Sequence, residues 1–443
     1  MILSTNMKKT MTRRSLLAAG LAGATGLLPK AQAEIRKMKI TRVRHYESPV
    51  SRAIFNQSFQ IVTVETDAGI TGIGEGGTPD MIRQLGALLI GQDPTRIDFL
   101  WQYMNRAYFY PSGRERLHAL GALDMALWDI KGKALGVPVW ELIGGRSRDY
   151  VAQRPRRRRA KPRGIARDAA PERVRLARSL KAGYCTGYPS KGSARESAAA
   201  CMRAGYRAYR TGVTGGGDGS KFNPRVEIHR THDHCKELRE GVGADGDWAI
   251  DYHTRLDFPD AVRLSTLLEP LEPLFCEDLV RSENPGIYKQ LRPMVKVPIA
   301  VGEQFGDRWD INELIEGRLI DYSRITMPNC GGITEMLKQC ALCETHYVGY
   351  VPHFTGPIAE AACVHLGAVF SGPALMEMTG TGVKLPDYLP KAFDFKDGKM
   401  WPNTRPGLGV EFDSSKVKLL AEIDKFAQPI PSYRRPDGSI TNW

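Results

Sequence analysis

Three acidic residues recur at a constant interval in the middle of the chain, and each follows a short apolar run. Asp251, Glu277 and Glu303 are 26 residues apart in each interval. One strand, one helix and two short loops take about that length, so the interval predicts equivalent positions on three neighbouring parallel strands. Their carboxylates would meet at the carboxyl ends of these strands, where they repel one another unless a cation offsets them. Oxygen ligands of this kind suit Mg²⁺, and we predict one such ion per subunit.

Two histidines accompany these acids. In the stretch D-Y-H, side chains at positions i and i+2 of a strand point to the same face, so Asp251 and His253 would project together. His353 ends a later apolar run, and Arg324 and Glu377 fall on the predicted strands before and after it. Imidazoles on nearly opposite walls of a metal site suit proton transfer. We therefore predict His253 and His353 as the catalytic residues.

The first 150 residues predict a module of strands and helices. A hairpin is expected over 59–77, with its turn at 67–69. A helix is expected over 114–135, because Gly136 and then Pro138 end the helical pattern. One face of this helix is formed by Leu120, Leu123, Leu127 and Ile130.

From about residue 184, seven strand-like runs alternate with segments of helical pattern, which indicates parallel β/α units. An eighth strand is expected either around AGYCTG (182–187) or within 151–181. The fold class is therefore α/β, a (β/α)₈ TIM-like barrel with an N-terminal α+β capping domain. The expected segments are a signal peptide (1–33), the capping domain (37–150), an anomalous Arg-rich segment (151–181), the barrel (182–400) and a C-terminal segment that returns to the cap (401–443).

The N-terminus resembles a twin-arginine export signal. Arg13 and Arg14 precede a modest apolar stretch, and Ala31-Gln32-Ala33 has the small-x-small pattern of a cleavage site. We expect a periplasmic or other extracytoplasmic location, or a cytoplasmic one if the signal is not used. No run of 18 or more apolar residues argues for a membrane span.

The formal net charge of +13 is concentrated in one segment, since residues 151–181 alone carry +10. The segment is interpreted as a solvent-exposed insertion or as a local reading-frame error, and a basic RNA-binding arm is the alternative. We expect no nucleic-acid partner, because no aromatic platform or nucleic-acid motif accompanies the charge.

Several motifs together resemble the mandelate racemase and muconate lactonizing branch of the enolase superfamily. They are the three spaced acids, the helix segment at 121–145, GGITE at 331–335 and PHFTGPIA at 352–359. The D-x-H stretch together with His353 resembles the acid-sugar dehydratases that act on galactonate and mannonate. The likeness extends from about residue 37 to the C-terminus, apart from the Arg-rich segment.

The resemblance implies a Mg²⁺-dependent dehydratase of a sugar acid. The C2 proton would be removed and the 3-hydroxyl eliminated, giving a 2-keto-3-deoxy acid. His353 would act as base and His253 as acid; the opposite assignment, or Tyr108 or Tyr110 as base, stays open. Glu377 would hydrogen-bond the substrate. The substrate would be a small carboxylate, and Arg324 would be a supporting charge. Relatives of this kind commonly form homo-oligomers, so we expect a homo-oligomer here.

Two departures from the family pattern affect the predicted activity. Many relatives have a lysine pair on the second barrel strand, whereas AYRTG supplies Arg210 and Gly212, which argues against racemases built on lysine bases. Galactonate-type relatives carry an aspartate on the sixth strand that orients the strand-seven histidine, and Thr326 stands at that position here. Mannonate-type relatives have a similar Arg-x-Thr.

Other interpretations of the chain remain open. A racemase or epimerase could use the same two histidines without eliminating water, and a non-catalytic protein could bind the sugar acid without turning it over. A zinc site at His229, His232 and His234 is disfavoured, because these residues lie in a charged helical stretch. Cys340 and Cys343 also fall in a helical pattern, which favours packing over metal or redox chemistry.

Overall fold

The computed structural model describes residues 37–47, 60–149, 184–186, 192–215, 221–353, 356–379, 385–396, 399–427 and 433–441. The expected signal peptide and the Arg-rich segment lie outside these described residues. No helix among the described residues is both long and apolar enough to cross a bilayer.

The capping module is a four-stranded antiparallel sheet with helices. Its strands are ordered β14-β1-β2-β3, and β2 and β3 form the predicted hairpin. Because β14 pairs with β1, the C-terminal part of the chain adds a strand to this sheet. The elements are β1 (Ile40–Tyr46), β2 (Ile61–Thr66), β3 (Thr71–Glu75), α2 (Pro79–Leu89), α3 (Ile97–Arg106), α4 (Gly113–Leu135), α5 (Val139–Leu142) and β14 (Leu419–Ile423).

Helix α4 ends as predicted, at Gly136, whose φ of 70° lets its N–H bond back to carbonyls of the last turn. The four residues predicted to form one apolar face are all buried, and α4 is in addition buried on nearly all its other sides. Its backbone lies against β3, so a Cβ at Gly74 would stand 1.8 Å from the Ala122 carbonyl oxygen. On the other side, a Cβ at Gly121 would stand 2.4 Å from the carbonyl oxygen of Pro328. The helix therefore lies between the cap sheet and a loop of the barrel.

In the described part of the chain, the barrel sheet has eight parallel strands in the order β10-β9-β8-β7-β6-β5-β4-β11. The first strand lies within 182–187, which decides between the two positions expected for it. The strands β10 and β11 are at the two ends of this order, and a bridge between Tyr350 and Ala374 joins β10 to the chain just before β11. The strands are β4 (Tyr184–Thr186), β5 (Ala208–Gly212), β6 (Asp247–Asp251), β7 (Cys276–Glu277), β8 (Ile299–Val301), β9 (Tyr322–Ser323), β10 (Gly349–Tyr350) and β11 (Glu377–Thr379).

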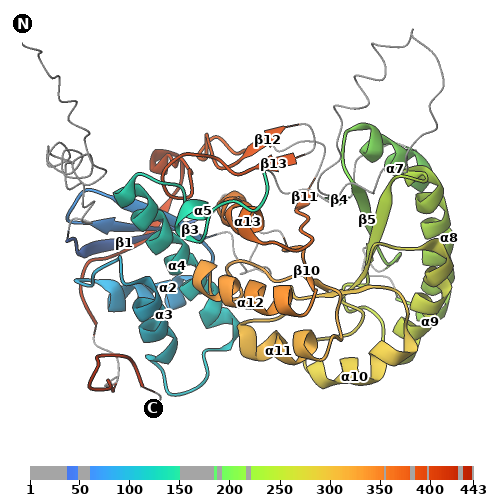
Figure 1. Ribbon diagram of the computed structural model, residues 1–443, viewed down its shortest axis with the longest axis horizontal. Helices are drawn as coiled ribbons and strands as arrows, with labels where there is room; N and C mark the ends of the chain where they lie inside the picture. Colours follow the sequence, from blue (N-terminus) through green and yellow to red (C-terminus); the bar gives the residue numbers. More distant parts are fainter. Residues whose placement is uncertain are drawn as a thin grey trace, which may run out of the picture. The chain divides into compact units, whose positions relative to one another are not determined.

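Helices connect these strands and follow one another around the sheet (Figure 1). The connection between β7 and β8 is reduced to one short helix with 3₁₀ turns, since Pro285 and Pro293 interrupt it. Cys340 and Cys343 are buried free thiols in α12, which confirms their packing role. The helices are α7 (Ala194–Arg203), α8 (Pro224–Val242), α9 (Phe258–Leu268), α10 (Tyr288–Leu291), α11 (Arg308–Glu316), α12 (Ile333–Thr345) and α13 (Pro357–Val369); the short hairpin β12 (Asp394–Lys396) and β13 (Lys399–Trp401) follows β11.

A buried aspartate fastens the cap to the barrel. The two carboxylate oxygens of Asp124, on α4, accept hydrogen bonds from the backbone N–H (2.9 Å) and the hydroxyl (2.6 Å) of Thr334, on α12. Gly332 makes room for it, because a Cβ there would stand 2.6 Å from the Asp124 carboxylate. The Asp124 contact accounts for Gly332 of the GGITE motif, and both Gly331 and Gly332 adopt left-handed φ values, of 99° and 90°, that favour glycine.

Asparagine at position 124 should change how stability depends on pH. Burial raises the pKa of Asp124 to about 7 from 3.8, although Thr334 donates to it. The folded protein therefore holds a proton that the unfolded chain releases, so the contribution of Asp124 is full below pH 3.8 and is lost as the pH rises to about 7. We expect Asp124→Asn to gain stability relative to wild type across that range, measured by urea unfolding. Asp80→Asn, an exposed aspartate on α2, should show no such trend; a difference that is flat or reversed for Asp124→Asn would contradict the prediction.

Candidate active site

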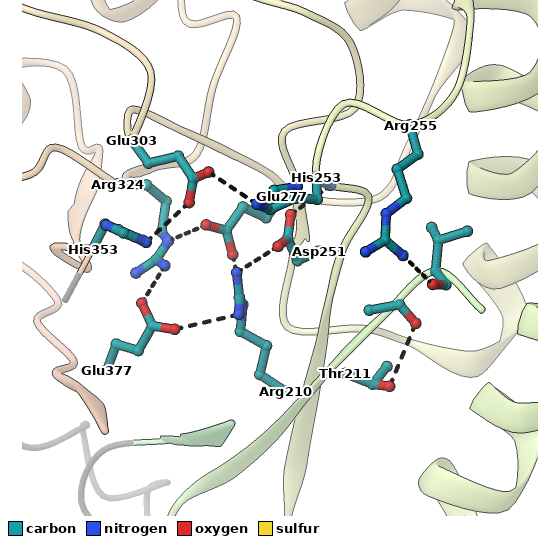
Figure 2. Close-up of polar contacts among 12 residues, drawn as sticks. Arg210, Thr211, Asp251, His253, Arg255, Glu277, Glu303, Arg324, His353 and Glu377 are labelled. Carbon is teal, nitrogen blue, oxygen red and sulfur yellow. Dashed lines mark hydrogen bonds and ion pairs between the residues drawn. The ribbon is translucent and has the colours of Figure 1, made fainter. Parts of the chain in front are cut away.

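The three spaced acids lie at the carboxyl ends of consecutive barrel strands, as predicted, but only Asp251 and Glu277 occupy equivalent positions, because Glu277 pairs with Ala300 on β8. Asp251 and Glu277 are the last residues of β6 and β7 and stand opposite each other in the register of the two strands. Glu303 follows β8 by two residues. All three reach the carboxyl ends of the strands, and Figure 2 shows them with the histidines and arginines of the site.

The closest acidic cluster differs from the expected set by one member. Among the described residues, ligand atoms of Glu277, Asp278 and Glu303 lie within 4.8 Å of one another. Asp251 lies beside them, but its Oδ2 accepts a hydrogen bond from Arg210 Nη2 at 2.7 Å and its Oδ1 one from the His253 backbone N–H at 2.6 Å. The structure therefore brings Glu277 and Glu303 together and adds Asp278. Ligation by Asp251 stays a prediction.

Asp278 was not predicted from the sequence, because the residue after an inward-pointing strand residue normally faces the other side. Here its φ is 44°, a left-handed conformation that departs from the strand geometry. Its Oδ2 is buried and accepts no hydrogen bond from any residue that the structure describes. Burial, together with Glu303, Glu277 and Asp251, raises the pKa of Asp278 well above its usual range. The adjacent acids in CEDL were the available signal.

These donors fit a hard divalent cation. They are carboxylate oxygens, and Asp278 Oδ2 and Glu303 Oε2 are both buried; among the described residues Asp278 Oδ2 accepts no hydrogen bond, and Glu303 Oε2 faces the His353 imidazole. Burial, with the nearby Glu277 and Asp251, raises the pKa of Glu303 to about 8. Burial and mutual repulsion disfavour the ionised form of these carboxylates, so a bound cation would stabilise it. Oxygen-only donors favour Mg²⁺.

Both catalytic candidates face Glu303. His353 Nε2 lies 3.2 Å from Glu303 Oε2, and His253 Nε2 lies 3.9 Å from Glu303 Oε1. Burial lowers the pKa of His353 to about 4, so its imidazole is neutral at pH 7 and able to accept a proton. Its Nδ1 lies 3.3 Å from the hydroxyl of Thr326.

His253 reaches the site by a route that the sequence analysis did not predict. Strand β6 ends at Asp251, so the same-face argument for a continuous strand was wrong. His253 instead has a φ of 49° in a turn that Asp251 stabilises by accepting its backbone N–H. Its side chain is 59% exposed, which leaves the imidazole accessible to solvent and substrate.

Two buried arginines hold the carboxylates beneath this cluster. Arg210, on β5, and Arg324, just after β9, donate from Nε to the two oxygens of Glu277, at 2.9 Å and 2.7 Å. Arg324 also donates to Glu377 Oε2, and Arg210 Nη1 lies 3.3 Å from Glu377 Oε1. The four residues form a closed ring of ion pairs (Figure 2).

Glu377 was predicted to hydrogen-bond the substrate, but in this ring its carboxylate is engaged by arginines. Its side chain is fully buried at the start of β11, and each of its oxygens faces an arginine. Burial alone would raise the pKa of Glu377, but Arg324 and Arg210 outweigh it and hold that pKa far below the usual range. Glu377 thus lies in the floor of the site, and its hydrogen bond to substrate stays a prediction.

Tyr108 and Tyr110 lie on a loop of the cap after α3 and are 46% and 64% exposed. Tyr108 packs against Tyr110, and the guanidinium of Arg116 lies over its ring. A few residues on, Arg114 donates to the hydroxyl of Ser282, in the loop that follows β7, at 2.7 Å. That bond ties the start of α4 to the barrel mouth, although a role for the tyrosines in substrate binding or catalysis stays a prediction. Residues 48–59 form another cap segment in which the family resemblance would place substrate specificity, and they lie outside the described residues.

Two family models match the chain. The mandelate racemase/muconate lactonizing enzyme N-terminal domain matches residues 35–144, and the enolase C-terminal domain-like model matches residues 193–416. D-galactonate dehydratases are similar over 92% of this chain and 100% of their own: the Xanthomonas oryzae pv. oryzae enzyme is 34% identical over 430 residues and the Ralstonia pickettii enzyme 32% over 426.

Solved structures share the fold. A member of the enolase superfamily from Salmonella Typhimurium superposes with a TM-score of 0.72 at 23% identity, covering 87% of this chain and 100% of that one. An enolase from Agrobacterium radiobacter, solved with Na and L-malate bound, has a TM-score of 0.70 at 27% identity, covering 91% and 99%.

Proposed function

The chain belongs to the mandelate racemase/muconate lactonizing enzyme family of the enolase superfamily, and we propose that this sugar-acid dehydratase works with one Mg²⁺ ion and removes the C2 proton of an aldonate. Elimination of the 3-hydroxyl then gives a 2-keto-3-deoxy acid. D-Galactonate is the first candidate substrate, since the curated relatives named above are D-galactonate dehydratases. The observation that carries the proposal is the pair of imidazoles facing the two oxygens of Glu303.

Glu277 and Glu303 would hold the ion, with Asp251 or Asp278 as the further acidic ligand. When bound, a divalent cation supplies positive charge that makes the proton beside a carboxylate removable. The oxygen-rich, largely buried donor set supports this assignment. The arginine ring beneath it keeps Glu277 ionised, because Arg210 and Arg324 outweigh burial and lower its pKa.

The two histidines would divide the proton transfers. His353, neutral because it is buried, takes the proton as the C2–H bond breaks. His253 gives a proton to the 3-hydroxyl as the C3–O bond breaks, so that water leaves. The resulting enol tautomerises to the 2-keto acid. Thr326 contacts the far nitrogen of His353 and so orients its ring.

A racemase or epimerase is the second candidate, because two histidines on either side of one carboxylate could also exchange a proton between faces. Such an enzyme would exchange the C2 hydrogen and release no keto acid. Its test is therefore contained in the assay for the first candidate.

A panel of aldonates and aldarates, incubated with the purified full-length chain and Mg²⁺, should yield a 2-keto-3-deoxy acid from D-galactonate or a close stereoisomer. The product is followed colorimetrically and confirmed by NMR. Loss of the C2 proton signal in D₂O without keto acid would favour the racemase. No change in any member of the panel would contradict both candidates.

A further inference from the structure

Arg210 connects the ring of ion pairs to the acids that are expected to bind the metal. It is 6% exposed, and its guanidinium contacts three different carboxylates. Nη2 lies 2.7 Å from Asp251 Oδ2, Nε lies 2.9 Å from Glu277 Oε2, and Nη1 lies 3.3 Å from Glu377 Oε1. Asp251 and Glu277 are also two of the acids expected to bind the metal.

The four members of the ring come from alternate strands of the barrel. Arg210, Glu277, Arg324 and Glu377 belong to β5, β7, β9 and β11 or to the residue directly after the strand. The interior of such a barrel is filled by layers of four side chains from alternate strands, which are mostly branched and apolar. Here one layer alternates positive and negative charge and is neutral as a unit. Asp251 lies outside this layer and takes its contact from Arg210.

We propose that Arg210 is a fixed counter-ion of the metal site, so that its guanidinium and a divalent cation neutralise the same two carboxylates and each weakens the effect of the other. The inference rests on the metal dependence in the proposed function. An arginine carries its charge at any relevant pH, so the positive charge is always present at the site. It keeps Asp251 and Glu277 in place before a cation binds, and it lowers the affinity of the site for that cation.

The sign of the effect follows from charge and reciprocity. A guanidinium hydrogen-bonded to two ligand carboxylates lies within a few ångströms of the bound cation, and at an effective dielectric constant of about 20 such like charges repel strongly. Because the coupling is reciprocal, a cation should stabilise the fold more when the guanidinium is absent. Removing the charge of Arg210 should therefore increase both the affinity for the cation and the stabilisation of the fold by that cation.

The test uses two substitutions of Arg210 in the full chain, stripped of metal with chelator. Arg210→Gln keeps hydrogen-bond donors and removes the charge, whereas Arg210→Lys keeps the charge and loses the forked geometry. Mn²⁺ affinity is measured by calorimetry and Mn²⁺-induced stabilisation by thermal unfolding. We expect Arg210→Gln to bind Mn²⁺ at least about tenfold more tightly, with a larger thermal shift, and Arg210→Lys to stay within about threefold of wild type.

Arg207→Gln is the matched control, because Arg207 directly precedes the same strand and pairs with Asp247 away from the acids; its Mn²⁺ affinity should be unchanged. An Arg210→Gln protein that folds only with Mn²⁺ would support the proposal. The proposal would be overturned if Arg210→Gln bound Mn²⁺ no more tightly than wild type, or if it failed to fold even in excess Mn²⁺. It would also be overturned if Arg210→Lys bound Mn²⁺ as tightly as Arg210→Gln does. Wild-type protein that binds no Mn²⁺ would overturn the metal dependence itself, whatever Arg210 does.

Discussion

His353→Asn should lower kcat for sugar-acid dehydration by about a thousandfold or more and should abolish exchange of the C2 hydrogen with solvent. The physical reason is that Asn cannot accept the proton, and general base catalysis contributes about 10²–10⁴-fold. His253→Asn should reduce dehydration by a similar factor but leave C2 exchange in place, because proton removal precedes departure of the hydroxyl. Both rates are followed by NMR in D₂O, with keto acid as the second readout.

The exposed His229, on α8, provides the control, since His229→Asn should have wild-type kinetics. The opposite pattern, with exchange surviving in His353→Asn and lost in His253→Asn, would reverse the two roles. If both variants kept full dehydration, neither histidine would be the base, and Tyr108 or Tyr110 would become the residue to test.

Glu277→Gln should abolish Mn²⁺ binding and Mg²⁺-dependent turnover and should also destabilise the fold. Glu277 lies between two buried guanidinium groups, at 2.9 Å and 2.7 Å, and is fully buried itself. Removing one partner of a buried ion pair costs about 3–5 kcal/mol, since charge is left uncompensated. Unfolding in urea and calorimetric titration with Mn²⁺ measure the two effects separately. Chelator should likewise remove wild-type turnover, and added Mg²⁺ should restore it.

Glu313→Gln is the matched control for this substitution. Glu313 lies on α11 and pairs with Lys289 at the surface, where both side chains are about half exposed. Such pairs contribute about 0–1 kcal/mol, so neither stability nor metal binding should change appreciably. Normal Mn²⁺ affinity in Glu277→Gln would place the metal elsewhere, and unchanged stability would mean that the two arginines do not depend on Glu277.

The barrel, and the order in which the acids appear around it, could be predicted from the amino-acid pattern alone. Consecutive β/α units place consecutive strands side by side, so the 26-residue interval predicted that Asp251, Glu277 and Glu303 lie at the ends of neighbouring strands, which are β6, β7 and β8. The end of α4 was predictable for the same kind of reason, since Gly136 adopts the left-handed conformation locally. These features depend on neighbours along the chain or on one repeated unit.

The contacts between side chains, by contrast, became apparent only in the folded protein. Arg210 meets Glu377 across 167 positions of the chain, because alternate strands contribute to one layer of the barrel interior. Asp278 and His253 enter the site through left-handed backbone that no residue pattern marked, since each is held by hydrogen bonds to neighbouring groups: the Asp278 N–H donates to the Ala300 carbonyl on β8, and the His253 N–H to Asp251. Strand order follows from local periodicity, whereas side-chain contacts depend on the full set of backbone positions around the barrel.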